Sequence, residues 1–389
     1  MGKSIYRIPL LKVKHGTWVH NLPYNGRLRS MNGMPTILVL VGITGDLARR
    51  KLLPAIEGLR AAGALPEKFE LVGITRRENA NGYFVMNHDD PQSYTDLAAH
   101  LENIEKKWGE PAQRLFYLSV APSVSLSIIT HLGESGLSHL PNTKLLVEKP
   151  FGTNYEDAAY TIEEINKHFA PEQQYRVDHY LAKGSVRAIA AQSHDLSNVS
   201  HIDILASEAL SIEGRTHFYE QTGALRDLIQ SHLLEVAAVA INPTDRLAAL
   251  KGLSVRPEIS IRGQYNGYRT EAGNPDSTTE TFASILLESK NAVFNGTVRL
   301  TTGKALAEKR TELQFMNADG TTKSIDLSDS HNAYEHVFAD AMAGDHTWFV
   351  SPDEALEDWR IVKPVQEAWS GDESGLKTYV PGTRADTLY

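Results

Sequence analysis

The sequence predicts a two-domain protein whose first domain is an α/β unit built on a parallel sheet. Apolar runs of strand length alternate with helical segments from Pro35 onward, a pattern typical of a parallel sheet with helices on both faces. A glycine-bearing turn separates the first apolar run from the first helical segment. With 389 residues, the chain is long enough for a second domain after this one.

The composition is that of an ordinary globular protein, with 41% hydrophobic and 22% charged residues. A formal net charge of −9 argues against a general nucleic-acid-binding surface, so a phosphate-bearing ligand would need a specific pocket. The chain has no cysteine, which excludes disulfides, thiolate metal sites and cysteine nucleophiles and is compatible with the cytoplasm. Redox chemistry would therefore depend on a bound cofactor.

The first 32 residues carry basic side chains but no sustained apolar run, so they resemble neither a signal peptide nor a membrane span. Met31 and Met34 stand immediately before the first clear strand. We interpret residues 1–32 as an N-terminal extension of uncertain status and expect the first domain to begin at residue 33.

The turn after the first strand is the first candidate ligand site. Gly42 and Gly45 allow the backbone to approach a pyrophosphate at the helix N-terminus, where unpaired N–H groups favour negative charge. The candidate cofactor-binding residues here are Gly42, Thr44, Gly45, Asp46 and Leu47. The turn lacks one glycine of the full dinucleotide fingerprint, so a tight structural turn is an equally good interpretation of this motif alone.

The second strand, FELVGITRR at residues 69–77, favours NADP over NAD. A fold that prefers NAD usually carries an acidic residue where this strand ends, to hold the ribose hydroxyls. Here Arg76 and Arg77 occupy the end, and an arginine fork suits a 2′-phosphate. The alternative is that both arginines are ordinary surface residues.

Two further strands are predicted at residues 114–122 and 143–152, with a helical segment at 124–132 between them. In a parallel sheet, ligands bind beyond the carboxyl ends of the strands. Pro122 and the Glu148-Lys149-Pro150 stretch would lie there, and Lys149 could reach both a cofactor and a substrate.

The stretch RVDHYLAKGS, residues 176–185, crowds an acid, an imidazole, a phenol and an amine together. If a helix begins near Tyr180, His179 and Lys183 face the same way one turn apart, a spacing that suits an anion. A solvated helix end is an equally good interpretation of the stretch by itself.

Five longer stretches, taken together, resemble the glucose-6-phosphate dehydrogenase family in the order in which that family has them: GDLARRKLLPA, LLVEKPFG, RVDHYLAK, EQTGALRDLIQSHLLEV and TTGKALAEKRTELQF. The resemblance runs from about Thr36 to the end of the chain. It implies a Rossmann-like NADP-binding domain at 33–178 and a β+α domain at 179–389 with a large, mainly antiparallel sheet. It also implies oxidation of a sugar phosphate at C1 and a homo-oligomer, dimer or tetramer, formed through that sheet.

The resemblance implies roles for individual residues. A base tuned near neutral pH must take the C1 hydroxyl proton as hydride leaves for the nicotinamide, and the family pattern places it at His232, oriented by Asp178. His179, Tyr180 and Lys183 would bind the phosphate, and Glu208 and Asp227 the sugar hydroxyls. The remaining polar lining around sugar and cofactor is Lys51, Lys149, Lys304 and Lys309. Without the resemblance, His232 is better interpreted as a core histidine, and TTGKALAEKRTEL as a common turn of an antiparallel sheet.

The chain departs from the family pattern in two ways. Ala182, Lys183 and Gly184 stand where the family usually has glycine, lysine and glutamate, and an interior Gly184 would weaken the expected helix by about 1 kcal/mol relative to alanine. The chain is also shorter than expected for the family. The altered stretch and the shorter length leave open the same chemistry on another aldose or amino-sugar phosphate. The shorter length alone also leaves open a non-catalytic NADP-binding protein.

We expect no metal site and no membrane or nucleic-acid partner. His194, His201 and His217 are scattered without ligand spacing, and His88 with Asp89 and Asp90 looks like a solvated loop. The expected small-molecule partner is a sugar phosphate.

Overall fold

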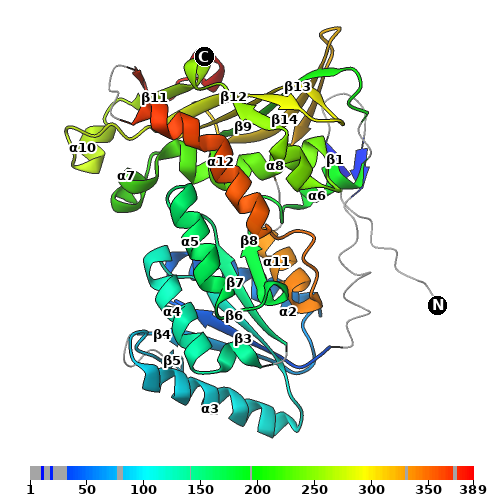
Figure 1. Cartoon of the computed structure of the whole chain (residues 1–389), viewed down its shortest axis with the longest axis vertical. Helices are drawn as coiled ribbons and strands as arrows, with labels where there is room; N and C mark the ends of the chain where they lie inside the picture. Colours follow the sequence, from blue (N-terminus) through cyan, green and yellow to red (C-terminus); the bar gives the residue numbers. More distant parts are fainter. Residues whose placement is uncertain are drawn as a thin grey trace.

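The computed structural model describes residues 33–76, 82–140, 142–192, 195–328, 332–370 and 375–389, together with the backbone of two short strands. These strands, β1 (Leu10–Lys12) and β2 (Trp18–His20), pair antiparallel with each other. The remainder of the expected N-terminal extension, Arg77 and His194 lie outside the described residues. Two sheets, one in each half of the molecule, dominate the fold (Figure 1).

The first sheet has six strands in the order β5-β4-β3-β6-β7-β8, and every neighbouring pair is parallel. The strands are β3 (Thr36–Val41), β4 (Phe69–Thr75), β5 (Phe84–Val85), β6 (Gln113–Leu118), β7 (Thr143–Glu148) and β8 (Gln174–Val177). The helices between them are the π-helix η1 (Ala48–Leu52), α2 (Leu53–Ala61), α3 (Pro91–Trp108), α4 (Pro122–Glu134), η2 (Leu137–His139), α5 (Tyr155–Asn166) and η3 (Pro171–Gln173). The predicted Rossmann-like sheet is confirmed, because β3 and β6 are buried along their whole length as parallel strands require.

The second sheet has eight strands and is mixed, with mainly antiparallel pairs. Its order is β15-β14-β9-β13-β12-β11-β16, and β10 also pairs with β12. The strands are β9 (Val199–Ser207), β10 (Leu253–Val255), β11 (Ile261–Tyr265), β12 (Phe282–Lys290), β13 (Asn295–Gly303), β14 (Arg310–Asn317), β15 (Thr322–Asp326) and β16 (Leu376–Tyr379). This sheet confirms the expected β+α second domain.

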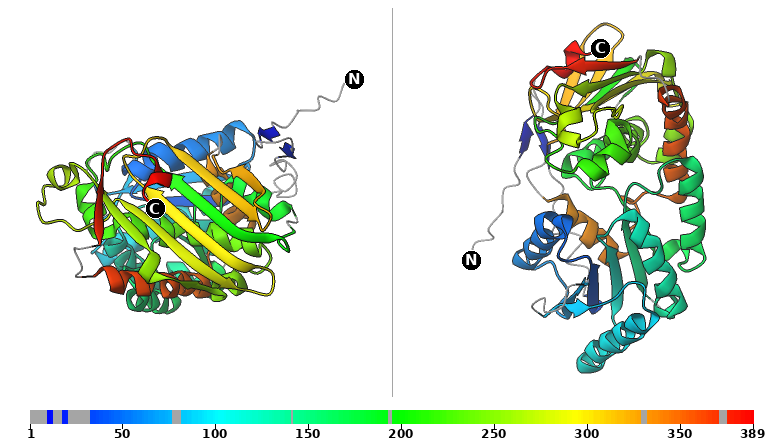
Figure 2. Two further views of the ribbon diagram at one scale, coloured as in Figure 1. Left: turned by 90° about the horizontal axis from the view of Figure 1, so that it is seen from above. Right: turned by 90° about the vertical axis from the view of Figure 1, so that its left-hand side faces the viewer.

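Helices lie against one face of the second sheet, and the C-terminal segment lies on the other (Figure 2). The helices that follow β8 in the sequence are α6 (Gly184–Ala191), α7 (Thr216–Ala224), the π-helix η4 (Leu225–Leu233), α8 (Leu234–Ile241), α9 (Arg246–Lys251), η5 (Pro257–Ile259), α10 (Tyr268–Ala272), α11 (Ala333–Ala343), α12 (Pro352–Trp369) and η6 (Ala385–Thr387). The helix predicted around His232 is therefore present, as η4 continued by α8.

The segment 301–313 is not the simple antiparallel turn that its sequence also allowed. β13 and β14 do not pair with each other, because β9 lies between them, parallel to β13 and antiparallel to β14. Residues 304–309 therefore cross over the carboxyl end of β9. This crossing brings Lys304 to the same edge of the sheet as Glu208, which follows β9.

Two late helices connect the two halves. α11 covers one face of the first sheet, where Val337 and Phe338 belong to the same buried cluster as Leu38 and Leu115. α12 packs against α5 of the first half and α9 of the second, and the indole N–H of Trp359 donates to the carbonyl of Phe151 over 2.9 Å. The predicted domain boundary after residue 178 stays a prediction, since α11 belongs by sequence to the second half but packs on the first.

Candidate active site

His232 and Asp178 form a buried pair between the two sheets. The imidazole Nδ1 lies 2.7 Å from Asp178 Oδ1, and the side chains are 8% and 0% exposed. Asp178 comes directly after β8, and His232 lies in η4, a π-helix of the kind often found at functional sites. A neutral imidazole that donates through Nδ1 carries its lone pair on Nε2, so the pair presents a base on the side away from Asp178.

The ionisation of Asp178 is controlled by its neighbours. Burial opposes the charged form, but the charge and hydrogen bond of His232, followed by Lys149 and His179, outweigh it and hold the pKa of Asp178 well below its usual range. Asp178 Oδ1 also accepts from the backbone N–H of Tyr180 over 2.8 Å. Asp178 is therefore a fixed anion that can hold His232 in one tautomer and stabilise its protonated form.

The expectation of a helix beginning near Tyr180 is wrong. Residues 178–183 form turns, with the N–H of Ala182 bonded to the carbonyl of Asp178, and α6 begins only at Gly184. The Asp178 side chain captures the N–H of Tyr180, and Lys183 has extended φ and ψ of −61° and 135° as the residue before the helix. Gly184 opens the helix, so the penalty for an interior glycine does not apply.

The turn nevertheless gathers its side chains around His232. The Tyr180 ring stacks on the imidazole with centroids 4.9 Å apart, and the Lys183 ammonium lies 3.7 Å from the centroid of the Tyr180 ring. The His179 ring lies 4.3 Å from that of His232. Burial first, and then the charges of His232, Lys183 and Lys51, lower the pKa of His179 well below its usual value, although Asp178 opposes them. This concentration of positive charge is an environment in which an anion would be stabilised.

A second polar group lies at the carboxyl edge of the larger sheet. Lys304, directly after β13, forms an ion pair with Glu208 and lies 3.3 Å from Asp227 Oδ2 on η4. Because β9 and β13 are parallel, the residues that follow them meet at one edge. The predicted sugar-binding residues Glu208, Asp227 and Lys304 are thus brought together, on the same helix η4 that carries His232.

Lys309 is exposed, at the end of the crossing segment. Thr311, the second residue of β14, forms a side-chain hydrogen bond with Tyr180. Lys309 precedes this strand, and its contact with the substrate stays a prediction. Arg310, between the two, points to the face opposite Thr311.

The candidate cofactor residues follow the carboxyl ends of the first sheet's strands. Gly42 has φ of +83°, and a Cβ there would lie 2.5 Å from the carbonyl oxygen of Ser119, so this turn requires glycine. Thr44 and Leu47 are half-buried in the turn, while Asp46 is exposed and pairs with Arg50 at 2.8 Å. The remaining described candidates at this edge are Gly45 in the same turn, Lys51 on η1, Arg76 after β4 and Pro122 at the start of α4. In this turn a ligand can come close to the backbone at the glycines, and cationic side chains lie at the same edge of the sheet. This arrangement fits a dinucleotide.

Lys149 occupies a different environment from the one its sequence position indicated. Its side chain is 1% exposed, and Nζ lies 2.9 Å from Asp358 Oδ2, 3.6 Å from Asp178 Oδ2 and 3.8 Å from Glu235 Oε1. The structure therefore buries this ammonium among carboxylates, directly behind the His232–Asp178 pair. Its contact with substrate and cofactor stays a prediction.

Sequence reasoning gave no role to three residues beside the pair, Glu148, Tyr117 and Tyr334. Glu148 accepts a hydrogen bond from Tyr117 and interacts in the same way with Tyr334 of α11. Burial is the largest influence on this carboxyl and, although the two tyrosines oppose it, raises the pKa of Glu148 to about 7. The only signal in the sequence was the place of Glu148 at the end of a strand, because Tyr334 comes from a helix far along the chain.

Replacing Glu148 with Gln should remove a pH-dependent loss of stability. A carboxyl whose pKa is raised from 4.5 to about 7 stabilises the fold below the unfolded pKa, and this contribution is lost as the pH rises through the folded pKa. The stability of the variant relative to wild type should therefore increase by on the order of 2–3 kcal/mol between about pH 4 and about pH 8. Urea unfolding across this range measures the difference, with exposed Glu110→Gln as the control; a difference that does not change with pH would contradict the prediction.

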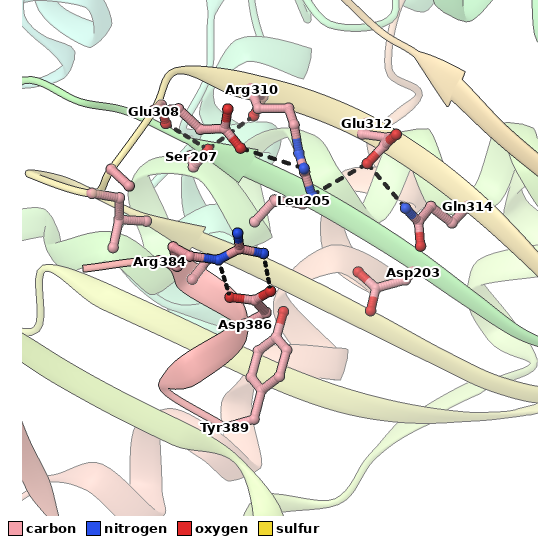
Figure 3. Close-up of a pocket in the computed structure, with 13 residues that line it drawn as sticks. Asp203, Leu205, Ser207, Glu308, Arg310, Glu312, Gln314, Arg384, Asp386 and Tyr389 are labelled. Atoms are coloured by element: carbon pink, nitrogen blue, oxygen red, sulfur yellow. Dashed lines mark hydrogen bonds and ion pairs between the residues drawn. The ribbon is translucent and has the colours of Figure 1, made fainter. Parts of the chain in front are cut away.

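A separate hollow lies on the outer face of the larger sheet, away from His232 (Figure 3). Its two arginines are paired within it: Arg310 with Glu308 and Glu312, and Arg384 with Asp386. Asp203 adds a further carboxylate to this lining, and the hollow contains none of the predicted site residues.

The loop expected at His88, Asp89 and Asp90 is present and Asp89 is exposed, but the expectation that His88 is solvated is wrong. His88 is 5% exposed, burial lowers its pKa, and its carbonyl accepts from Tyr94. Within the part of the chain that the structure describes, no group of three or more His, Asp or Glu side chains is placed to hold a metal ion. In the same part of the chain, no helix combines the length and the hydropathy needed to cross a bilayer.

A Rossmann-like sheet joined to a large mixed sheet, with a His–Asp pair between them, is the architecture of a two-domain nicotinamide-dependent dehydrogenase. A myo-inositol dehydrogenase from Corynebacterium glutamicum shares this fold with a TM-score of 0.56 at 14% identity, covering 86% of this chain and 96% of that one. The chain belongs to the glucose-6-phosphate dehydrogenase family. It matches the family's NAD binding domain at residues 39–87 and 78–188 and its C-terminal domain at 187–325 and 315–387, which confirms the resemblance.

Individual relatives match over most of their length. The glucose-6-phosphate 1-dehydrogenases of Chlamydia muridarum and Bacillus subtilis are 27% and 28% identical, covering 90% and 89% of this chain and 93% and 94% of theirs. A glucose-6-phosphate dehydrogenase solved with its substrate has a TM-score of 0.80 at 23% identity, covering 92% of this chain and 98% of that one. A glucose-6-phosphate 1-dehydrogenase from Mycobacterium avium has a TM-score of 0.76 at 25% identity, covering 90% and 95%.

Proposed function

We propose that this protein oxidises glucose 6-phosphate at C1 to 6-phosphogluconolactone, with NADP as the hydride acceptor. The observation that carries the proposal is the buried 2.7 Å contact between His232 and Asp178, placed where the strands of the cofactor sheet end. Relatives with this named activity at about the same length support it.

His232 is the general base of the proposed reaction. Its Nε2 takes the proton of the C1 hydroxyl. A bound nicotinamide would supply the acceptor for the hydride on the same carbon, and the C1–O bond would become the lactone carbonyl. Asp178 keeps the imidazole in the required tautomer and stabilises the imidazolium that forms. Because both groups are buried, their mutual attraction is little screened by water.

The phosphate and sugar ends of the substrate are assigned to separate groups. His179, Tyr180 and Lys183 bind the phosphate, supported by the stacking of Lys183 on Tyr180 and of Tyr180 on His232. Glu208, Asp227 and Lys304 accept or donate to the sugar hydroxyls, with Lys309 at the rim. Lys149 contributes its positive charge from behind Asp178.

NADP is assigned to the edge of the first sheet. Gly42, Thr44, Gly45, Asp46 and Leu47 form the pyrophosphate turn, which the positive φ of Gly42 supports. Lys51, Pro122 and Lys149 complete the nicotinamide side, and Arg76 and Arg77 bind the 2′-phosphate.

Replacing Arg76 with Ser should weaken NADP selectively. A charge-assisted hydrogen bond is worth about 1.5–3 kcal/mol, so KM for NADP should rise about 10- to 100-fold. NAD has no 2′-phosphate, so its KM should stay unchanged. Initial rates with both nucleotides measure the effect, with exposed Arg60→Ser as the control; an equal loss with both would mean that Arg76 does not read the 2′-phosphate.

The proposed activity is tested by NADPH absorbance with pure protein and glucose 6-phosphate. Other aldose and amino-sugar 6-phosphates form a second arm, because the altered stretch after Lys183 leaves another substrate open. Turnover of glucose 6-phosphate at the highest kcat/KM supports the proposal. Higher turnover of another sugar phosphate would retain the chemistry and change the substrate, and silence with all of them would favour a non-catalytic NADP-binding protein.

We further propose a cytoplasmic homo-oligomer that associates through the larger sheet, as the family resemblance implies. Light scattering after size-exclusion chromatography tests the assembly. A monomer at micromolar concentration would contradict it.

A further inference from the structure

A chain of alternating buried charges runs from His232 through Asp178 and Lys149 to Asp358 and Glu235. His232 contacts Asp178, and Lys149 lies beyond Asp178 in contact with Asp358 and Glu235. All the side chains beyond the histidine are 1% exposed or less. Charges so deeply buried interact strongly with one another, so a change in one member affects the others.

The chain is assembled from four segments that only the fold brings together. Lys149 follows β7 and Asp178 follows β8, while Glu235 lies three residues after His232 on the next helix. Asp358 comes from α12, 209 residues from Lys149 along the sequence. The hydrogen bond from neighbouring Trp359 to Phe151 fixes α12 at this position.

Two carboxylates compete for the Lys149 ammonium. Asp358 Oδ2 accepts its hydrogen bond at 2.9 Å. Asp178 Oδ2 lies 3.6 Å away and has no hydrogen-bond partner among the described residues. Lys149 therefore donates its hydrogen bond to Asp358 and not to Asp178. The negative charge of Asp178 stays available to the His232 imidazole, which contacts Asp178 Oδ1.

We propose that Asp358 is a positioning residue that holds Lys149 back from Asp178 and thereby keeps His232 basic. This inference rests on the proposed function for its catalytic meaning, but its central claim concerns the basicity of His232 in the free protein. If Asp358 lost its charge, Lys149 would pair with Asp178, and the carboxylate would stabilise the imidazolium less.

The charged and titratable groups that face this chain come from every element packed around it. They are Glu148 and Lys149 after β7, Asp178, His179, Tyr180 and Lys183 in the turn after β8, His232 and Glu235 on η4 and α8, Arg246 on α9, Tyr334 on α11, Glu354 and Asp358 on α12, and Lys51 on η1. Arg246 Nε lies 3.3 Å from Glu235 and 3.1 Å from Glu354, so it anchors the far end of the chain. Burial first, and then the charge of Asp358, raises the pKa of Glu235 well above its usual range. Burial also raises the pKa of Asp358 to about 7, although the charge and hydrogen bond of Lys149 oppose it, so the comparison of variants is made above pH 7 as well as below it.

The test is the pKa of His232 in the free protein, measured by NMR with carbon-13-labelled histidine. Its signal is assigned among the 15 histidines by its absence in His232→Asn. Asp358→Asn keeps the size of the side chain and removes its charge, and it should lower the pKa of His232 by about half to one unit. Asp358→Glu restores the charge and should return the pKa of His232 to its wild-type value.

The matched control is Asp340→Asn, which removes another largely buried carboxylate, that of Asp340 on α11, which pairs with Arg187 on α6. It should leave the pKa of His232 unchanged. An unchanged or raised pKa of His232 in Asp358→Asn would overturn the proposal. This readout needs no substrate, so it remains decisive even if the proposed activity fails.

A double-variant cycle tests the route through Lys149. In a Lys149→Gln background there is no ammonium to hold back, so Asp358→Asn should no longer shift the His232 titration. An undiminished shift would mean that Asp358 acts only through its own charge and would overturn its role in holding Lys149. In active protein, the acidic limb of kcat/KM should move to lower pH in Asp358→Asn by the same amount as the NMR titration.

Discussion

Replacing His232 with Asn should lower kcat by roughly 10²- to 10⁴-fold, the contribution typical of a general base. Asparagine is close in size and can still donate to Asp178, so the buried carboxylate keeps a partner and the fold is retained. It cannot accept a proton, so the C1 hydroxyl would have to lose its proton to water. KM should change little, because we assign the binding of the phosphate and the sugar hydroxyls to other side chains.

Initial rates at saturating glucose 6-phosphate and NADP measure this loss, and thermal unfolding confirms that the variant is folded. His179 provides the natural comparison, since its ring lies only 4.3 Å from that of His232. His179→Asn should affect KM more than kcat, because we assign it to the phosphate. A His232→Asn rate within tenfold of wild type would move the base to another residue.

Replacing Lys183 with Gln should raise KM for the sugar phosphate about 10- to 100-fold, the effect expected for the loss of about 1.5–3 kcal/mol from one charge-assisted contact. The ammonium is held 3.7 Å from the centroid of the Tyr180 ring, and that ring stacks on His232, so Lys183 is fixed at the site rather than free in solvent. Glutamine retains a hydrogen-bond donor but removes the charge, so the change isolates electrostatic attraction to the phosphate.

Unphosphorylated glucose gives the sharpest control for Lys183. The variant and the wild type should use glucose equally poorly, because the missing interaction is with the phosphate alone. Exposed Lys167→Gln should behave as wild type with both substrates. An equal loss with glucose and glucose 6-phosphate would show that Lys183 supports the local structure instead of binding phosphate.

Local pattern was sufficient for the first half of the fold. The apolar runs that became β3 and β6 are buried along their whole length, those of β4 and β7 over most of it, and such strands are mainly apolar in sequence. The glycine turn was equally predictable from the sequence, because the positive φ of Gly42 and its close approach to Ser119 require glycine at this position. The strand predicted at 69–77 ends at Thr75, two residues early, as boundaries in such predictions often do.

Long-range pairing decided what local pattern could not. The turn at 178–183 does not continue as a helix because Lys183 is extended, with ψ of 135°, and α6 starts only at Gly184. The position of α11 on the first sheet depends on apolar contacts with strands that lie far away in the sequence. Neither the end of this turn nor the position of α11 can be predicted from a window of a few residues.

The sequence by itself determined the class of the protein, through the order of its strands and helices, its glycine turn and the five stretches that carry the family resemblance. Only the tertiary structure decided the partners of the buried charges, above all the pairing of Lys149 with Asp358 across 209 residues. The physical reason is that apolar periodicity is a local property of the chain. The stability of a buried charge depends instead on which distant groups the fold places beside it.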